Sequence, residues 1–279
     1  MPLPVPTLDH VVVNVRDRID EAAETYRRLG FTLTPRGYHT LGSMNHLAMF
    51  GTEYLELIAA PAGDTRRPEI LAAPEGLNGL VWGSDDAAGT YQSLHAAGVP
   101  VDPPLQFSRP VALLDGTRDA SFRIVRLAAG TTTAGRLYFC HHLTRDLVWR
   151  DEWRHHPNKT IGVSGAIIAS QNPQTLAHLF SRMFGDDAVR MTPDGCRLLV
   201  GLSQFDVVTP AALARMLPDI ALDGGGRSEF MAALTLRTRS LAAVDAALRA
   251  GGIDTARRED QRIVVPATAA FGTALEFRE

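Results

Sequence analysis

The chain has 279 residues, of which 45% are hydrophobic and 21% are charged, the balance of an ordinary globular protein long enough for two domains. Its formal net charge of −3 and the lack of a basic run give no reason to expect nucleic acid or an anionic membrane as a partner. Two cysteines exclude a disulfide framework and favour a reducing compartment.

The N-terminal stretch MPLPVPTLDH has no basic segment followed by an apolar one, so it does not read as a secretory signal. The longest apolar runs are too short to span a membrane. We therefore expect a cytoplasmic protein with a small-molecule substrate or ligand and with no nucleic-acid or membrane partner. A homodimer remains open at this point.

Four strand-like segments along the chain are each followed by an amphipathic helix. The segments are LDHVVVNV (8–15), LNGLVWGS (77–84), VSGAIIAS (163–170) and FMAALTLRT (230–238). The expected helix caps are Asp17, Asp85, Asn172 and Thr238 or Ser240. Each helix ends at a glycine suited to a left-handed C-terminal cap, namely Gly30, Gly98, Gly185 and Gly252.

Three further strand-like runs follow each helix, so each unit reads strand, helix, strand, strand, strand. The helix-ending glycines are spaced by 68, 87 and 67 residues, which pairs the units into two halves. We predict an α+β protein of mixed sheets with helices on one face of each sheet. The predicted domains are 1–145 (units 7–61 and 76–145) and 161–279 (units 161–210 and 228–279), joined by a bridge at 146–160.

Strand alternation predicts which side chains of the first unit point away from the helices. In the first strand an all-valine face suits packing on helices, which leaves His10 and Asn14 on the opposite face. In EYLELIA the two leucines suit the helix side, which places Glu56 on the same face as His10. An unpaired buried carboxylate is costly, so Glu56 needs a positive partner.

The segments DHVVVNVRD, YRRLGF, YLELI and FGTALEF, together with the four-unit order, resemble the vicinal oxygen chelate superfamily. Within it, YLELIA and the bridge HLTRDLVWRDEWRHHPN resemble the glyoxalase-like group. The resemblance covers nearly the whole chain. It implies that paired units curl each sheet into a cup with the helices outside, and that the cup commonly holds a divalent metal ion.

His10 and Glu56 would supply two ligands of such an ion (Fe, Mn, Zn or Ni), and a direct hydrogen bond between them without metal is the alternative. The second unit departs from the superfamily pattern, because Gly79 stands opposite His10. Aligning YLELI on YFCHH sets Cys140 opposite Glu56, with His142 on the same face. We predict His142 as the third ligand, with Cys140 and His141 as lesser candidates, and we expect Cys140 to line the pocket as well.

Substrate-binding residues are predicted around the same cup. The stretch GYHTLGSMNHLAMF (37–50) brings His39 and Asn45 to the cup, and its resemblance to a pattern of the glyoxalase-like group implies that Asn45 contacts substrate. Asn14 shares the inward face of His10. Arg109, with Arg123 as a second candidate, offers a fork of donors for a carboxylate or enolate, although arginines on strands often pair with acids at the rim.

Two functions follow. The first is a metal-dependent enzyme of the glyoxalase type, acting on a small carbonyl, enediol or aromatic substrate through a chelated enolate, with Glu56 as the general base. Lyase, isomerase and dioxygenase outcomes share that step, so the sequence does not choose between them. The second is a protein of the same fold that binds a small molecule or drug without metal, which the small residue Gly79 at a ligand position favours.

Overall fold

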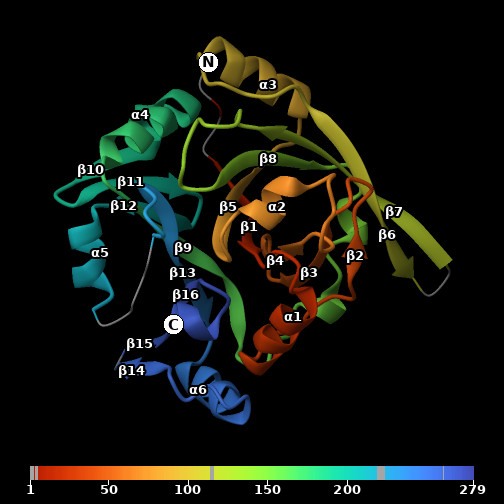
Figure 1. Ribbon diagram of the computed structural model, residues 1–279, viewed down its shortest axis with the longest axis vertical. Helices are drawn as coiled ribbons and strands as arrows, with labels where there is room; N and C mark the ends of the chain where they lie inside the picture. The colour runs from red at the N-terminus through yellow and green to blue at the C-terminus, as the bar shows by residue number, and fades with distance from the viewer. Residues whose placement is uncertain (1–2, 4–5, 114–115, 219–223, 260) are drawn as a thin grey trace.

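The computed structural model describes residues 3, 6–113, 116–218, 224–259 and 261–279. Two eight-stranded mixed sheets form the protein, one from each half of the chain (Figure 1). The strand order is β2-β3-β4-β1-β5-β8-β7-β6 in the first sheet and β10-β11-β12-β9-β13-β16-β15-β14 in the second. This is the predicted α+β fold of paired cups. All strands of the first sheet lie within 8–142 and those of the second within 160–278, while the exact domain boundaries stay a prediction.

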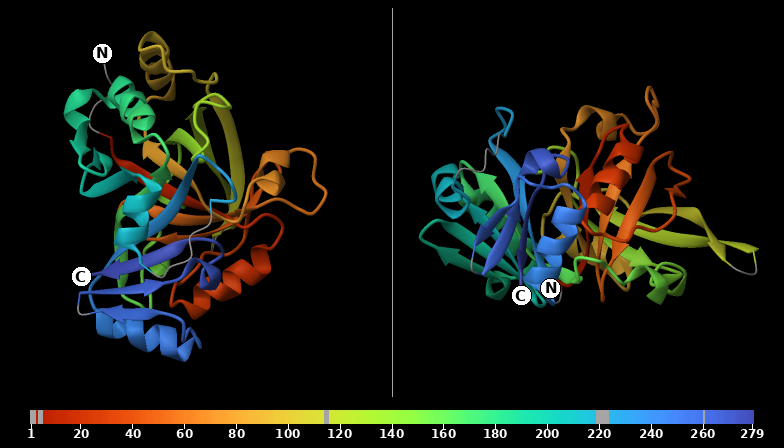
Figure 2. Two further views of the ribbon diagram at one scale, coloured as in Figure 1. Left: turned by 60° about the vertical axis from the view of Figure 1, so that its left-hand side comes forward. Right: turned by 90° about the horizontal axis from the view of Figure 1, so that it is seen from below.

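The first sheet carries three helices. Its strands are β1 (Leu8–Asn14), β2 (Gly37–Tyr38), β3 (Met44–Met49), β4 (Tyr54–Ala59), β5 (Gly76–Gly83), β6 (Leu105–Leu113), β7 (Gly116–Arg126) and β8 (Arg136–His142). Its helices are α1 (Ile19–Arg28), α2 (Pro68–Ala72) and α3 (Ala87–Ala96). Strands β6 and β7 form a long hairpin that projects from the body of the molecule (Figures 1 and 2).

The second sheet repeats this plan. Its strands are β9 (Thr160–Ser170), β10 (Val189–Thr192), β11 (Gly195–Val200), β12 (Ser203–Val208), β13 (Glu229–Thr238), β14 (Arg257–Glu259), β15 (Arg262–Val265) and β16 (Ala274–Arg278). Its helices are α4 (Pro173–Phe184), α5 (Pro210–Met216) and α6 (Leu241–Ala250). None of the helices built from the described residues has both the length and the apolar character that a membrane crossing requires.

The helix ends follow the sequence closely. Gly30, Gly98, Gly185 and Gly252 all have positive φ, as expected of residues that end helices. Two expected caps are wrong by one residue: Arg18 rather than Asp17 precedes α1, and Asp86 rather than Asp85 accepts a hydrogen bond at the start of α3. The side chain of Ser240 caps α6 as expected, whereas Asn172 precedes α4 without a capping bond from its side chain.

One hydrophobic core fills the space between the two sheets. It combines the helix-facing valines of β1 with residues of β9, β13, α4 and α6. Across it, the Trp82 ring lies 5.2 Å from that of Phe184, and Phe31 stacks on Phe277 at 6.2 Å. The helix-bearing faces therefore pack together, and the opposite face of each sheet looks outward.

The bridge between the halves is held by two buried side chains. His156 donates to the backbone carbonyl of Met49 through Nε2 and accepts from the Thr32 amide at Nδ1. Asn158 donates to the carbonyl of Leu29. These bonds tie the bridge, with its 3-10 turns Arg145–Leu147 and Asp151–Trp153, to the first half.

Each of the four strands that open a unit carries a β-bulge at a corresponding place. The pairing of β1 with β5 skips Asp9 on one strand and Asn78 on the other. The pairing of β9 with β13 skips Ser164 and Ala232 in the same way. A bulge sets two residues against one and re-aims the extra side chain, so its place in β1 bears on the functional site.

Candidate functional site

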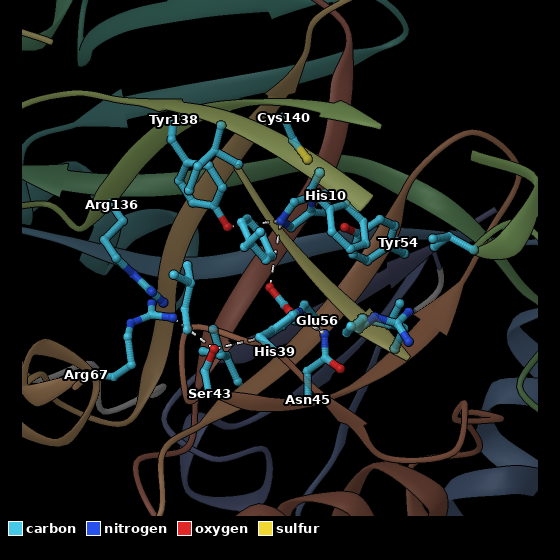
Figure 3. Close-up of a pocket in the computed structure, with 18 of the residues that line it drawn as sticks. His10, His39, Ser43, Asn45, Tyr54, Glu56, Arg67, Arg136, Tyr138 and Cys140 are labelled. Atoms are coloured by element: carbon cyan, nitrogen blue, oxygen red, sulfur yellow. Dashed lines mark hydrogen bonds and ion pairs between the residues drawn. The ribbon is translucent and has the colours of Figure 1, made fainter. Parts of the chain in front are cut away.

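A pocket opens on the outward face of the first sheet (Figure 3). Strands β1, β3, β4, β6, β7 and β8, the segments before β3 and α2, and Val148 of the bridge supply its walls, which enclose a cavity of about 60 Å³. The described residues lining it are His10, His39, Leu41, Ser43, Asn45, Leu47, Tyr54, Glu56, Ile58, Arg67, Phe107, Arg109, Phe122, Ile124, Arg126, Arg136, Tyr138, Cys140 and Val148. Charged and polar side chains make up about half of this lining, and aliphatic and aromatic side chains make up most of the rest.

The bulge in β1 places Asp9 and His10 side by side. Leu8 pairs with Trp82 of β5, and His10 pairs with Val81, the neighbour of Trp82. Asp9 therefore has no partner of its own in the ladder. Simple alternation would send Asp9 toward the helices, whereas its carboxylate oxygen accepts a hydrogen bond of 2.6 Å from Nδ1 of His10. Both residues are buried. The bulge therefore supplies His10 with a carboxylate partner.

His10 is held by groups on three sides. Asp9 accepts the Nδ1 proton, the Tyr138 hydroxyl lies 3.0 Å from Nε2, and the Tyr54 ring stacks on the imidazole at 4.4 Å. With Nδ1 donating to Asp9, Nε2 of the neutral ring is an acceptor that faces the pocket. Burial raises the pKa of Tyr138 well above its usual value, so the phenol keeps its proton and donates to His10.

Glu56 faces His10 from β4. Its Oε2 lies 3.7 Å from Nε2 of His10, and its Oε1 accepts a 2.6 Å hydrogen bond from the amide of Asn45. Burial by itself raises the pKa of Glu56, but the imidazoles of His10 and His39 and the Asn45 hydrogen bond outweigh it and lower the pKa. The carboxylate is therefore charged at neutral pH, and polar groups on the described strands compensate it.

A second imidazole, His39, completes the floor of this site. Its Nδ1 lies 2.9 Å from the Ser43 hydroxyl, and its Nε2 lies 3.3 Å from the Asn45 amide nitrogen. Desolvation, opposed by Glu56, lowers the pKa of His39 to about 4. The neutral ring then accepts at Nε2 and donates at Nδ1, and Ser43 also accepts a 2.8 Å bond from Arg67.

The strand register corrects the predicted alignment of the second unit. Glu56 lies in β4 two residues beyond the partner of His10. In β5, Gly79 occupies the place of His10. Gly79 pairs with Arg136 of β8, and the residue two positions after Arg136 is Tyr138. Tyr138, not Cys140, therefore corresponds to Glu56. The shift of two residues arises because YLELI matches RLYFC rather than YFCHH.

The predicted ligand His142 lies beside the pocket and not within it. Its Nε2 bonds to Asp9 at 3.1 Å. Among the described residues, Asp9, Cys140 and His142 form a group of three potential ligands whose donor atoms lie within 4.8 Å of one another. The predicted set of His10, Glu56 and His142 does not form such a group there. Burial raises the pKa of Cys140, so its thiol stays protonated.

Other predicted residues divide into two sets. His39, Asn45, Arg109 and Cys140 line the pocket with His10 and Glu56. Asn14 does not, because its amide donates to the carbonyls of Ile70, Ala73 and Pro74 and so anchors α2 to the first strand. Asn14 shares a strand face with His10 and still lies outside the pocket. Alternation predicts which face of a strand a side chain occupies, but not how far along the strand the pocket extends.

The sequence did not predict four residues of the site. Tyr138, Arg67 and Arg136 line the pocket, and Asp9 stands behind His10. Tyr138 shares a strand face with Cys140, so alternation alone points to it once the register is known. Asp9 is hidden by the bulge, which one sequence does not reveal. Arg67 precedes a short helix, and nothing in its local sequence indicates that it reaches a pocket.

The corresponding positions of the second sheet carry ion pairs. Asp206 bonds to Arg197 at 2.6 Å, and Glu276 bonds to Arg262 at 2.8 Å and to Arg278 at 2.7 Å. Helix α5 and apolar side chains of β9 and β13 pack over that face. The second sheet thus pairs its acids with arginines where the first sheet pairs Glu56 with imidazoles.

An eight-stranded sheet that curls around a buried imidazole and carboxylate has the architecture of the vicinal oxygen chelate fold. The chain belongs to the glyoxalase-like domain family, whose model matches residues 8–184. That match spans the first sheet, the bridge and the strand and helix that open the second half.

Solved structures share the fold at low sequence identity. A hypothetical protein from Staphylococcus aureus has a TM-score of 0.67 at 13% identity, with 98% of this chain and 99% of that chain covered. A mutant of 4-hydroxymandelate synthase from Streptomyces coelicolor has a TM-score of 0.58 at 13% identity, covering 99% and 94%. A xylose isomerase-like TIM barrel/4-hydroxyphenylpyruvate dioxygenase fusion protein gives 0.58 at 14%, covering 100% and 50%. A search of curated proteins found no match.

Proposed function

We propose that this protein is a glyoxalase-like enzyme that removes a proton next to the carbonyl of a small anionic compound, with a divalent metal ion stabilising the enolate. The observation that carries the proposal is the approach of His10 Nε2 to Glu56 Oε2 at 3.7 Å inside a pocket, with Asp9 bonded behind the imidazole. A carboxylate behind a histidine is the usual support of a metal-binding imidazole, and it equally supports a general base.

The donor set fits one half of a divalent metal site. His10 and Glu56 offer a nitrogen and an oxygen that suit Fe, Mn, Zn or Ni, and Asp9 would orient the imidazole. The corresponding positions of the second unit offer no side chain at Gly79 and a phenol at Tyr138. An ion held there would therefore depend on two protein ligands and on oxygens of the substrate or water. When bound, it would supply Lewis acidity for the enolate charge.

The side chains of the pocket can perform the proton transfer. Glu56 is ionised at neutral pH, and when its Oε2 does not hold the ion it can accept a proton there, while Asn45 holds its other oxygen. Arg109 is 93% buried, and no hydrogen bond to a described residue engages its guanidinium, which leaves its donors for an anionic group of the substrate. Phe107 and Phe122 stack at 5.1 Å and form an aromatic wall of the pocket, which would keep water from the reacting carbon of a bound substrate.

The proposal is tested by metal content and by hydrogen exchange. The protein is purified without chelators, its metal is measured, and small keto acids are incubated with it in D2O while NMR follows exchange of the α-proton. Glu56→Gln should slow exchange at least 100-fold, because a general base contributes about 10²–10⁴-fold. His10→Ala should lose both metal and exchange. Glu24→Gln and His95→Asn, on exposed helix positions, are the matched controls.

A metal-free binding protein is the second candidate, and Gly79 and Tyr138 at ligand positions favour it. In that case the purified protein holds no stoichiometric metal and catalyses no exchange. It binds its ligand equally well after Glu56→Gln. That result would remove the enzyme proposal and leave the binder.

A further inference from the structure

Positive charge dominates the pocket lining. Among the residues that the structure describes, four guanidinium groups, those of Arg67, Arg109, Arg126 and Arg136, line it together with one carboxylate, that of Glu56. Asp9, the acid behind His10, already accepts bonds from His10 and His142. Buried charge of one sign is costly unless an opposite charge compensates it, so the arginines indicate an anionic ligand.

Arg136 is the most informative of the four. Its Nε donates to the Asn78 side chain at 3.2 Å, while its Nη2 is buried and has no hydrogen-bond partner in the described part of the protein. Asn78 is the bulge residue of β5, so the β-bulge fixes the side chain that orients this guanidinium. A buried guanidinium nitrogen without an acceptor is rare in folded proteins, which points to an acceptor on a ligand.

Arg67 lies next to Arg136. Figure 3 shows the two guanidinium groups facing each other on one side of the pocket, and Arg67 donates to Ser43 at 2.8 Å through Nη1. The charges of the two groups also repel each other. Burial lowers the pKa of Arg136, and the positive charge of Arg67 lowers it further. Glu69 pairs with Nε of Arg67 at 2.6 Å but lies outside the pocket lining. Two adjacent guanidiniums suit one oxyanion group between them.

Arg109 lies at a different wall. A Cβ built on Gly37 would come within 3.2 Å of Arg109 Nη1 and 2.4 Å of Asn45 Oδ1, so the guanidinium lies beside Asn45. Figure 3 places Asn45 and the Arg67–Arg136 pair on opposite sides of His39 and Glu56. The pocket therefore has two cationic ends, with the acid–base pair His10 and Glu56 between them.

We infer that the substrate of the proposed enzyme is a dianion with two separated oxyanion groups, one bound by Arg67 and Arg136 and the other by Arg109. This inference rests on the proposed function for the chemistry between the two ends but not for the binding itself. A carboxylate or a phosphate would satisfy either end, and a short spacer carrying a carbonyl would lie against His10 and Glu56. A compound with one acidic group would leave one end uncompensated.

Binding of simple dicarboxylates tests the inference without turnover. Titration calorimetry at constant ionic strength compares succinate, glutarate and adipate with butanoate, pentanoate and hexanoate, the monoanions of equal length. The wild-type protein should bind the best dianion at least 10-fold more tightly than its matched monoanion. Arg136→Gln, Arg67→Gln and Arg109→Gln should each abolish that preference, because each removes one of the two anion-binding ends. Inorganic phosphate, used as a competitor, distinguishes a phosphate-binding end from a carboxylate-binding one.

Arg123→Gln is the control, since Arg123 donates to Gln106 and does not line the pocket. It should keep the dianion preference. Circular dichroism establishes that each variant is folded, and Arg67→Gln carries the test where Arg136→Gln does not fold. Equal affinity of the wild type for dianions and monoanions, no binding of any probe, or an unchanged preference in the folded variants would overturn the inference. Failure of hydrogen exchange alone would overturn the proposed function and leave the dianion site standing.

Discussion

Asp9 orients the imidazole of His10 through a hydrogen bond of 2.6 Å to Nδ1. Burial by itself raises the pKa of Asp9, but His142 and His10 outweigh it and hold the pKa below its usual range. The ionised carboxylate fixes the Nδ1 proton of His10 and makes Nε2 the acceptor, to which the Tyr138 hydroxyl donates in this structure. The same orientation serves a metal ligand and a proton-transfer group.

Replacing Asp9 by Asn should therefore lower activity without unfolding the protein. Loss of the carboxylate behind a ligating or catalytic histidine costs about 10–100-fold in metal affinity or activity. We expect a fall of that size in the rate of hydrogen exchange and in metal content, measured beside Asp17→Asn, an exposed acid outside the site. An Asp9→Asn enzyme of full activity would show that His10 needs no charged partner.

His39 makes stability depend on pH. Its pKa is about 4 in the folded protein against 6.5 for an unperturbed histidine, so between these values the unfolded chain binds a proton that the folded one does not. Stability is therefore lost as pH falls from about 6.5 to 4. A shift of this size corresponds to about 3 kcal/mol at most, and the partial exposure of the residue reduces it to about 2 kcal/mol.

Denaturant unfolding of the wild type and of His39→Gln at pH 7, 6, 5 and 4 measures this effect. The variant keeps a polar side chain near Ser43 but has no proton to gain. The wild type should lose about 2 kcal/mol more than the variant across this range. Parallel curves for the two proteins would exclude His39 as the source.

At the scale of elements, the short strand β2 positions Asn45 because Gly37 has no side chain. Gly37 pairs with Asn45 in the β2–β3 ladder, and a Cβ at Gly37 would lie 2.4 Å from Asn45 Oδ1. The bond from Asn45 to Glu56 depends on that space. The glycine is required by close packing, since its φ is not in the left-handed region.

Gly37→Ala should thus displace Asn45, weaken its bond to Glu56 and reduce ligand binding. Overpacking of this kind costs about 1–3 kcal/mol of stability. Gly51→Ala is the control, because a Cβ there meets no atom within 4 Å. Calorimetry with glutarate and thermal melts compare the two. Equal binding and equal melting temperatures would mean that β2 shifts freely to make room.

The bulges in the four opening strands show why element-level prediction succeeded only in part. Hydrophobic patterning found the strands, the helices and the helix-ending glycines, because burial of one face imposes its period on the sequence. The bulges at Asp9 and Asn78 add one residue without altering that pattern. They supply the partner of His10 and the residue that orients Arg136, and both escaped prediction.

At the scale of the whole molecule, the two halves are joined by close backbone approaches as well as by their shared core. Arg28 in α1 donates to the carbonyl of Gly251 at 2.6 Å, and a Cβ at Gly251 would lie 1.9 Å from the backbone oxygen of Arg28. Gly76 and Gly272 approach similarly. These contacts set the distance between the sheets.

Gly251→Ala should separate α1 from α6 and destabilise the whole protein. The backbone of Gly251 is helical, so alanine fits locally and the cost comes from the contact between halves. We expect a loss of about 2–3 kcal/mol in the free energy of unfolding, in a single transition because one core spans both sheets. Two separate transitions in calorimetry would show that the halves unfold independently.

The amino-acid sequence by itself determined the repeated units, the two sheets and the inward face that carries His10 and Glu56, because these depend on local periodicity and on the cost of burying charge. It also placed His39, Asn45 and Arg109 near that face. Only the tertiary structure decided the strand register, which replaces Cys140 by Tyr138 and moves His142 out of the pocket. Only the tertiary structure shows that Arg67 lies beside Arg136 (Figure 3). Register and bulges depend on pairing between distant strands, so no local pattern encodes them.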